Sequence, residues 1–503
     1  MKTASRFLLI TLLLAGTAAL LLARLARPPR TSTQGAPLAP LLLYCAAGLK
    51  APVSAAVADY ERRFGVRVEI QYGGSGTLLS NLRVARRGDL FLAADTDFLT
   101  LARTNGLLRE VLPVASIQPV VAVARGNPKS VRTLADLQRS GVAVALANPD
   151  AAAIGRLTRS ALLKAGVWTN LSAQARVFKP TVNDVANDVK LGAVDAGIVW
   201  DATLRQYPEL EGVPVPEFAH EHSQIAVGIL DSATSARAAL HFARFLAASD
   251  AGLPHFQQAG YQVVEGDPWV PSPSVVLYSG GVNRMAIEDT LRRFEEREGV
   301  QITRVYNGCG ILTSQIRAGQ RPDAYFACDV SFMTTVQEYF QPSTELAETR
   351  MVILTKQGNP RQIRTLADLA APSLRVGVAN AEQSALGALT ARLLRELGLD
   401  QAIQPNIVVQ TPTADLLVNQ VRAGGLDAAV VYQANTSQVL NSLHVIPIES
   451  PAALAIQPFA IARSSRHTFL MSRLLEALAS TESRLRFEQT GFAWRAPTNH
   501  FAP

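Results

Sequence analysis

Residues 126–137, Gly-Asn-Pro-Lys-Ser-Val-Arg-Thr-Leu-Ala-Asp-Leu, return almost unchanged as residues 358–369, Gly-Asn-Pro-Arg-Gln-Ile-Arg-Thr-Leu-Ala-Asp-Leu. Nine of the twelve residues are identical, and the two stretches are 358 − 126 = 232 residues apart. Two further pairs recur in register: Tyr72-Gly-Gly-Ser-Gly76 with Tyr306-Asn-Gly-Cys-Gly310, and Asp195-Ala-Gly-Ile-Val-Trp200 with Asp427-Ala-Ala-Val-Val-Tyr432. A period this long predicts two whole domains and not a solenoid.

The composition agrees with two soluble globular units. A chain of 503 residues is too long for one core. With 48% hydrophobic and 18% charged residues, it is neither disordered nor broadly embedded in a membrane. Only 6% of the residues are aromatic, and the net charge of +7 comes from basic residues spread over predicted helix faces. We therefore expect no nucleic-acid partner.

The N-terminus carries a separate signal. The apolar run 7–23 follows Lys2 and Arg6 and precedes three arginines and two prolines. This pattern predicts an export signal or a membrane anchor over residues 1–30, followed by a linker over 31–40. Because no small-x-small cleavage site precedes the arginines, we favour the anchor. The mature protein is expected on the extracytoplasmic side, with the membrane as a partner through residues 7–23.

Each repeat predicts alternating strands and helices. Apolar runs at 41–44 and 275–278 open the two repeats, and helical patterns follow that stop at Gly65 and Gly299. A second strand and a Gly-rich turn come next in both. This order predicts two α/β domains with parallel-rich sheets, at 41–268 and 275–498, joined by a linker at 269–274.

The same strand, turn and helix pattern recurs in the second half of each repeat. Asn148-Pro-Asp and Asn380-Ala-Glu follow short apolar strands and precede helices. Two lobes per repeat would then present helix N-termini to one cleft, and free backbone amides at helix starts bind oxyanions without a positive side chain. We place the hinges near residues 117, 213, 350 and 447.

Taken together, these motifs resemble the periplasmic molybdate-binding protein family, which has the type II periplasmic-binding fold. The resemblance covers nearly all of both repeats. It rests on the opening strand with its small-residue loop and on four further motifs of the first repeat: residues 64–78, the strand ending at Ala93-Ala-Asp, Asn148-Pro-Asp, and Gly197-Ile-Val-Trp. It implies a tandem duplication of that fold, each copy being two α/β lobes with a cleft that holds a small oxyanion, molybdate or tungstate above all. It also implies an ABC transporter permease as partner.

The resemblance carries specific ligand-binding positions onto this chain. In the first repeat they are Ala47, Gly48, Gly74, Ser75, Ile154, Gly155, Asp184, Val185 and Trp200. In the second repeat they are Gly280, Gly281, Gly308, Cys309, Leu386, Gly387, Asp415, Leu416 and Tyr432.

Both sets depart from the family pattern. Gly48 replaces a serine, Trp200 replaces a tyrosine, and Cys309 replaces the serine of the Gly-rich turn. Each change removes or weakens a hydrogen-bond donor. The alternative is that either copy has kept its turns for folding while its binding has drifted.

The cysteines and histidines do not favour catalysis. Cys45, Cys309 and Cys328 are an odd number without metal-ligand spacing, and we expect Cys309 and Cys328 to be buried free thiols, with a bridge between them as the alternative. Cys309 at a helix start would suit a nucleophile, but no histidine lies in a predicted cleft loop. No catalytic residue, metal or cofactor is expected. Two other functions stay open: a tethered sensor or scavenger with the same cleft, and a ferric-iron binder, although no tyrosines are adjacent in the sequence.

Overall fold

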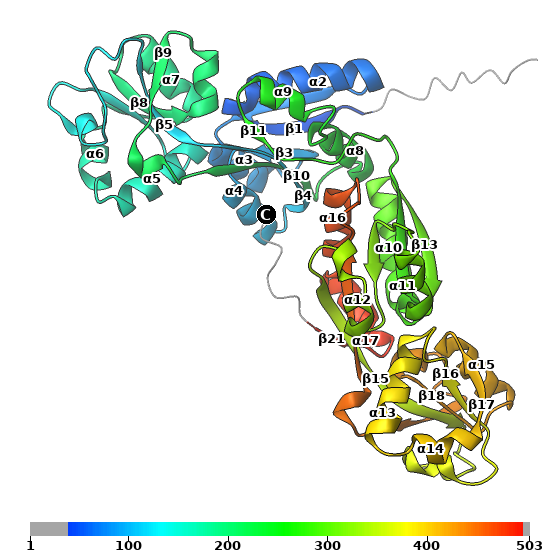
Figure 1. The fold of residues 1–503 in the computed structure, drawn as a ribbon. Coiled ribbons are helices and arrows are strands. Elements are labelled where there is room, and N and C mark those ends of the chain that lie inside the picture. The colour runs from blue at the N-terminus through cyan, green and yellow to red at the C-terminus, as the bar shows by residue number, and fades with distance from the viewer. Residues whose placement is uncertain (1–38, 496–503) are drawn as a thin grey trace, which may run out of the picture. The chain divides into compact units, whose positions relative to one another are not determined.

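The computed structural model describes residues 39–495 and divides each repeat into two α/β lobes (Figure 1). The predicted apolar segment 7–23 lies outside these residues. Among the helices that are described, none has both the length and the apolar character of a membrane span.

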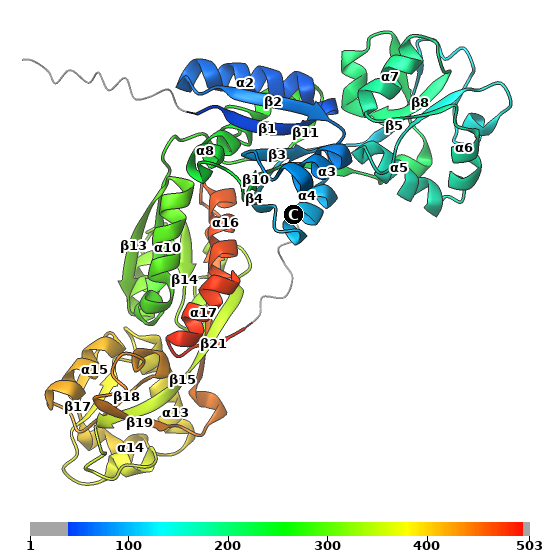
Figure 2. The same cartoon turned by 180° about the vertical axis from the view of Figure 1, so that it is seen from behind.

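The first lobe of the first repeat is built on a six-stranded sheet in the order β11-β4-β10-β3-β1-β2. The central strand β1 runs parallel to β2 and β3, while β10 returns antiparallel to β3 and β4. The helices cover both faces, with α8 and α9 beside α2 and with α3 beside α4 (Figures 1 and 2). The elements are β1 (Leu41–Ala46), η1 (Ala47–Leu49), α2 (Lys50–Phe64), β2 (Val68–Gly73), α3 (Ser75–Ala85), β3 (Leu90–Ala93), α4 (Thr96–Thr104), β4 (Leu108–Ile117), β10 (Ser223–Leu230), α8 (Ala236–Leu246), α9 (Leu253–Gln258) and β11 (Gln262–Val263).

The second lobe holds a five-stranded sheet in the order β7-β6-β8-β5-β9. Strand β6 is parallel to β7 and β8, whereas β5 is antiparallel to both of its neighbours. The sheets are therefore mixed, because β10 in the first lobe and β5 in the second run against their neighbours. The elements are β5 (Pro119–Ala124), η2 (Asp136–Gln138), β6 (Val144–Ala147), α5 (Ala153–Lys164), α6 (Trp168–Gln174), β7 (Val177–Lys179), α7 (Val182–Lys190), β8 (Ala196–Trp200), η3 (Asp201–Gln206), β9 (Leu210–Val213) and η4 (Pro216–Phe218).

The second repeat follows a similar order of strands and helices, on one continuous ten-stranded sheet. Its long strand β15 pairs with β20 in one lobe and with β18 in the other. The elements are β12 (Ser274–Gly280), η5 (Gly281–Asn283), α10 (Arg284–Glu298), β13 (Gln301–Asn307), α11 (Cys309–Arg317), β14 (Ala324–Phe326), α12 (Val330–Thr334), η6 (Gln337–Tyr339), β15 (Thr344–Lys356), η7 (Ala367–Ala370), β16 (Val376–Ala379), α13 (Ala385–Glu396), α14 (Asp400–Ile403), η8 (Gln404–Asn406), β17 (Ile407–Thr411), α15 (Ala414–Ala423), β18 (Ala428–Tyr432), η9 (Gln433–Asn435), β19 (Leu443–Pro447), η10 (Pro451–Ala453), β20 (Leu454–Ile461), α16 (Thr468–Leu478), α17 (Thr481–Gln489) and β21 (Ala493–Trp494).

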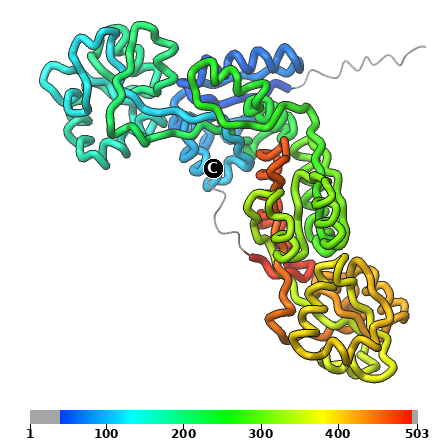
Figure 3. Tube along the Cα trace, viewed as in Figure 1, coloured from blue at the N-terminus to red at the C-terminus, as the bar shows by residue number. Residues whose placement is uncertain are grey.

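Two connections join the lobes of each repeat, and Figure 3 follows them along the trace. In the first repeat, β4 ends at Ile117 and β5 begins at Pro119. Proline has no N–H for the ladder and is tolerated at the first residue of a strand, so the ladder breaks there. The matching residue of the second repeat is Met351, which keeps its N–H, and β15 continues through the crossing.

The twelve-residue stretch that reveals the duplication builds a structural loop. Asn127 and Asn359 have positive φ angles of 45° and 47°, which asparagine tolerates better than most residues. The Asn127 side chain bonds both backbone groups of Val131, with its Nδ2 donating at 2.7 Å and its Oδ1 accepting at 2.9 Å. Asn359 does the same with Ile363. The two repeats therefore share this stretch because the fold needs it, and the stretch lies away from the clefts.

Candidate functional site: two interlobe clefts

Four helix starts meet at the cleft between the lobes of the first repeat. Helices η1 and α3 come from the first lobe, and α5 and α7 from the second. The cavity between them has a volume of about 20 Å³, far below that of a drug-sized site. It is lined by Ala46, Ala47, Gly48, Gly73, Gly74, Ser75, Ala94, Ala152, Ala153, Ile154, Thr181, Val182 and Trp200.

The lobes touch across this cleft through backbone groups. The Gly76 N–H donates to the Ala151 carbonyl oxygen at 2.9 Å. A Cβ atom at Gly76 would lie 2.0 Å from the Asp150 carbonyl oxygen, and one at Gly74 would lie 2.3 Å from that of Ala151. These two glycines allow the start of α3 to reach the opposite lobe, because no side chain fits between the two backbones.

The lining of the first cleft carries no charged side chain. Ser75 is 1% exposed, and its hydroxyl oxygen accepts a hydrogen bond from the Ala94 N–H at 3.2 Å. The Tyr261 hydroxyl donates to the Gly48 carbonyl oxygen at 2.7 Å and thereby fixes the first loop. Since the first amides of a helix have no acceptor within it, the cleft offers backbone N–H groups, a hydroxyl and the Trp200 indole, which together suit a small anion.

The cleft of the second repeat repeats this plan with more polar side chains. Helices η5, α11, α13 and α15 start at its edge, and its cavity is also about 20 Å³. The lobes touch in the same way, since the Gly310 N–H donates to the Gln383 carbonyl oxygen at 3.0 Å. The lining residues are Gly281, Val282, Asn307, Gly308, Cys328, Ser384, Leu386, Pro412, Thr413, Ala414, Asp415, Tyr432 and Asn435.

The prediction of two free thiols in the second repeat is wrong, because Cys309 and Cys328 form a disulfide. In the first repeat the matching residues are Ser75 and Ala94, which are joined by the hydrogen bond described above. The same two chain segments are thus held together in both repeats, by a hydroxyl in one and by a covalent bond in the other. A disulfide sulfur has no thiolate, so this pair does not supply the nucleophile that an enzyme would need.

The structure also shifts the pairing of the acidic residues by one position. Thr181 and Thr413 are the N-caps of α7 and α15, and 413 − 181 = 232. Asp415 therefore matches Asn183 and not Asp184. The Asp184 side chain instead accepts a hydrogen bond from the Thr181 hydroxyl at 2.6 Å, at the start of its own helix.

The predicted positions fall into two groups. Those that line a cavity are Ala47, Gly48, Gly74, Ser75, Ile154, Trp200, Gly281, Gly308, Leu386, Asp415 and Tyr432. Those that do not are Gly155, Asp184, Val185, Gly280, Cys309, Gly387 and Leu416. Val185 is fully buried and its N–H donates to the Thr181 carbonyl oxygen at 3.4 Å, while Leu416 is 47% exposed. Gly155 and Gly387 serve packing, since a Cβ atom there would lie 2.5 Å and 2.3 Å from a carbonyl oxygen.

Sequence reasoning missed several lining residues, most of which lie at helix starts. They are Ala152, Ala153, Thr181 and Val182 in the first cleft and Asn307, Ser384, Thr413, Ala414 and Asn435 in the second. The sequence carried a signal for Thr181 and Thr413, because a threonine directly before a helical pattern is a typical N-cap. Most of these residues are caps or first helical residues, one to three positions before the ones predicted on the same helix.

A basic residue lies on the first helix of each repeat. The ammonium of Lys50 is 5.6 Å from the centre of the Tyr72 ring, and the guanidinium of Arg284 is 5.4 Å from that of Tyr306. Neither basic residue lines a cavity. Their charges add a positive field without a direct contact to the cleft.

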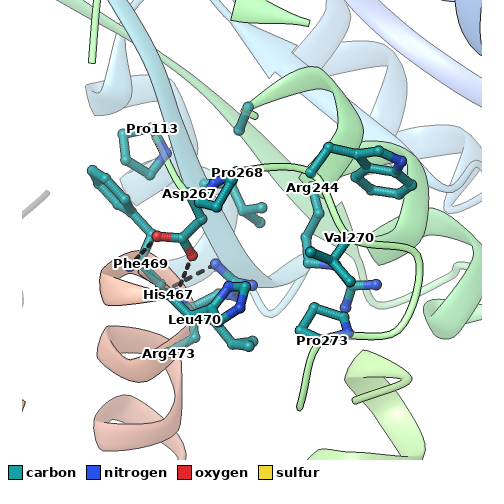
Figure 4. A pocket seen from close by; sticks show the side chains of 13 residues that line it. Pro113, Arg244, Asp267, Pro268, Val270, Pro273, His467, Phe469, Leu470 and Arg473 are labelled. Atoms are coloured by element: carbon teal, nitrogen blue, oxygen red, sulfur yellow. Dashed lines mark hydrogen bonds between the residues drawn. The ribbon is translucent and has the colours of Figure 1, made fainter. Parts of the chain in front are cut away.

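A further cavity of about 30 Å³ lies beside the predicted linker. Figure 4 shows Asp267 above the first turn of α16, where its carboxylate oxygens accept hydrogen bonds from the N–H groups of Phe469 at 3.0 Å and Leu470 at 2.9 Å. Burial raises the pKa of Asp267, and the two amides oppose that shift. Glu298, close by and 1% exposed, pairs with Arg473 at 2.6 Å. These groups are engaged with one another, so the cavity marks a structural contact.

Comparison with known proteins finds relatives that each match about half of this chain. The molybdate-binding protein ModA of Mycobacterium bovis is 28% identical over 239 residues, which are 47% of this chain and 88% of that protein. The periplasmic molybdate-binding protein of Azotobacter vinelandii matches with a TM-score of 0.39 and 19% identity, over 44% of this chain and 98% of that one. The sulfate-binding protein SubI of Mycobacterium tuberculosis matches with a TM-score of 0.38 and 15% identity, over 45% of this chain and 88% of that one.

Paired α/β lobes that enclose a small cavity at their helix starts define a solute-binding protein. A family model of bacterial extracellular solute-binding proteins matches residues 41–262 and again residues 275–493. The chain belongs to that family and contains its domain twice.

Proposed function

We propose that this protein captures a small tetrahedral oxyanion outside the cytoplasm, with molybdate or tungstate as the ligand, and delivers it to the permease of an ABC transporter. The observation that carries the proposal is the first cleft, where four helix starts and an uncharged lining surround about 20 Å³. Backbone amides at helix starts carry partial positive charge, so they can replace the hydration shell of an anion without a counterion.

The geometry favours a small ligand over a large one. A cavity of this volume holds about one or two water molecules, so it accommodates only an ion that is slightly larger than these. The donors are fixed by the fold before the ligand arrives, which lowers the entropy lost on binding. The name of the Mycobacterium bovis relative, a molybdate-binding protein, supports molybdate as the first ligand to test. The membrane anchor at residues 7–23 and the permease partner belong to this proposal.

Proline substitutions at helix starts test the proposal directly. Ala153 and Ala385 are the first residues of α5 and α13. Proline is favoured at this position but lacks the N–H, so each substitution removes one helix-start amide at the edge of a cleft. Ala153 lines the first cavity, and Ala385 directly follows Ser384, which lines the second. The preceding residues have ψ angles of 140° and 136°, which suits a following proline.

Calorimetric titration of the full chain with molybdate, tungstate, sulfate and phosphate is the measurement. We expect Ala153→Pro to abolish binding in the first cleft and Ala385→Pro to abolish it in the second. Ala236→Pro, at the first residue of α8 and away from both clefts, is the control and should change nothing. If the wild-type chain gives no binding heat with any of the four oxyanions, the proposal fails.

A further inference from the structure

The two clefts differ at one matched position on the helices that close them. The second residue of α7 is Asn183, and the second residue of α15 is Asp415. Both helices follow a threonine N-cap, so the two positions have the same place in the fold. An amide in the first repeat is thus replaced by a carboxylate in the second.

Asp415 lines the second cavity together with two polar side chains that have spare hydrogen-bonding capacity. Its carboxylate accepts a hydrogen bond from the Asn435 Nδ2 at 3.0 Å. The Tyr432 hydroxyl belongs to a side chain that is 2% exposed, and neither this hydroxyl nor the Asn435 Oδ1 finds a partner among the described residues. Since buried polar atoms are rarely left unpaired, the cleft is prepared for a ligand that both donates and accepts hydrogen bonds.

The surroundings of Asp415 act on its ionisation in opposite directions. Burial is the largest influence and leaves the pKa of this carboxyl above its ordinary value, while the hydrogen bond from Asn435 and the charge of Arg284 oppose that shift. The Asn435 Nδ2 already donates to this carboxylate, and the ionised form only accepts hydrogen bonds. A fully deprotonated oxyanion beside an ionised carboxylate has no proton to share and is repelled.

We infer that the second cleft selects oxyanions that keep a proton at neutral pH, such as hydrogen phosphate or hydrogen arsenate, and that the first cleft takes fully deprotonated ones. In the second cleft, the O–H of the ligand donates to Asp415 while the Tyr432 hydroxyl and the helix-start amides donate to the other ligand oxygens. The first cleft has no acceptor of this kind in its lining. This inference rests on the proposed oxyanion capture and divides it between the two repeats.

A cation is a poorer fit for the same carboxylate. Four helix starts point their partial positive charge at the cavity, and Arg284 adds a full charge nearby. An anion that brings its own proton satisfies both the amides and the carboxylate.

The test isolates the second cleft with Ala153→Pro and measures the affinity ratio of inorganic phosphate to molybdate by calorimetry at neutral pH. We expect phosphate to bind more tightly than molybdate. Adding Asp415→Asn removes the charge and should shift the ratio toward molybdate by roughly tenfold to a hundredfold, the usual size of a hydrogen bond to a charged group. Asp415→Ser, which is also well tolerated at a helix start, should shift it in the same direction. Asp400→Asn, at the first residue of α14, is the matched control and should leave the ratio unchanged.

The outcomes separate the two proposals. If the chain binds oxyanions but Asp415→Asn and Asp415→Ser both leave the ratio within twofold, the selection by Asp415 is refuted while oxyanion capture stands. A second cleft that binds molybdate more tightly than phosphate refutes it as well. If neither cleft binds any oxyanion, both proposals fail together.

Discussion

Gly76→Ala tests whether closure of the first cleft requires a bare backbone at the start of α3. The new methyl group would lie 2.0 Å from the Asp150 carbonyl oxygen, well inside contact distance. It would also displace the hydrogen bond from the Gly76 N–H to the Ala151 carbonyl oxygen. Overpacking costs about 1–3 kcal/mol, and a lost hydrogen bond costs about 1 kcal/mol. The closed form of the cleft should therefore be destabilised by about 2–4 kcal/mol.

Because the ligand binds the closed form, its apparent affinity is proportional to the fraction of the protein that is closed, and it falls as that fraction falls. A cost of about 2–4 kcal/mol corresponds to an affinity roughly 30-fold to several hundredfold lower. Calorimetry in the Ala385→Pro background measures the first cleft alone. Thermal melting should show a small change without ligand and loss of the rise in Tm that ligand gives the wild type. Alanine is a better helix former than glycine, so weaker binding would not come from a weaker helix.

Two further variants complete this test. Gly310→Ala places a Cβ atom 1.9 Å from the Glu382 carbonyl oxygen and should weaken the second cleft in the same way. Gly425→Ala, whose nearest contact would be 3.5 Å away, is the control. If Gly76→Ala binds molybdate as tightly as the wild type does, the lobes do not close through this contact and the reasoning is refuted.

Three predictions concern stability. The Cys309–Cys328 disulfide closes a loop with a separation of 19 residues, so reductant should lower the free energy of unfolding by about 3 kcal/mol in urea titration; an unchanged midpoint would count against the bond. Glu298→Gln should lower the free energy of unfolding by about 3–5 kcal/mol because it leaves buried arginines unpaired. The control Glu296→Gln, on the surface, should have almost no effect. Equal losses of stability in thermal melting of the two variants would contradict this. Burial above all, and then neighbouring arginine charges, lower the pKa of His241 to about 4. The neutral imidazole therefore stabilises the fold above pH 6.5, and this contribution is lost as the pH falls toward about 4. His241→Gln should flatten the dependence of stability on pH between these two values.

The internal repeat and the α/β order could be predicted because both depend on local patterns. The glycines at 65 and 299 end helices in the left-handed conformation, with φ of 67° and 69°, as their position after a helical pattern suggests. The crossing near residue 350 lies where β15 changes its strand partners. A strand that continues through both lobes was not foreseen, since no local signal shows which sheet a strand will join.

The candidate site was predicted only as far as its loops. Residues in Gly-rich turns, such as Gly74 and Gly308, lie at the clefts as expected because each follows a strand at its carboxyl end. On the helices of the second lobes, Ile154, Leu386 and Asp415 line a cavity, whereas the other predicted positions lie one to three residues beyond the lining ones: Gly155, Asp184, Val185, Gly387 and Leu416. The direction of an amide depends on where the first helical turn begins, and sequence fixes that boundary to within only a few residues.

The sequence by itself determined that the chain is duplicated, that each copy alternates strands and helices, and that glycine-rich turns stand at helix starts, because these follow from identity, periodicity and backbone freedom. Only the tertiary structure decided which groups share a cavity. It joined Cys309 to Cys328 and brought Asp415 beside Asn435, across separations of 19 and 20 residues. Such contacts arise from the packing of distant segments, and neither residue of a pair carries a local mark of its partner.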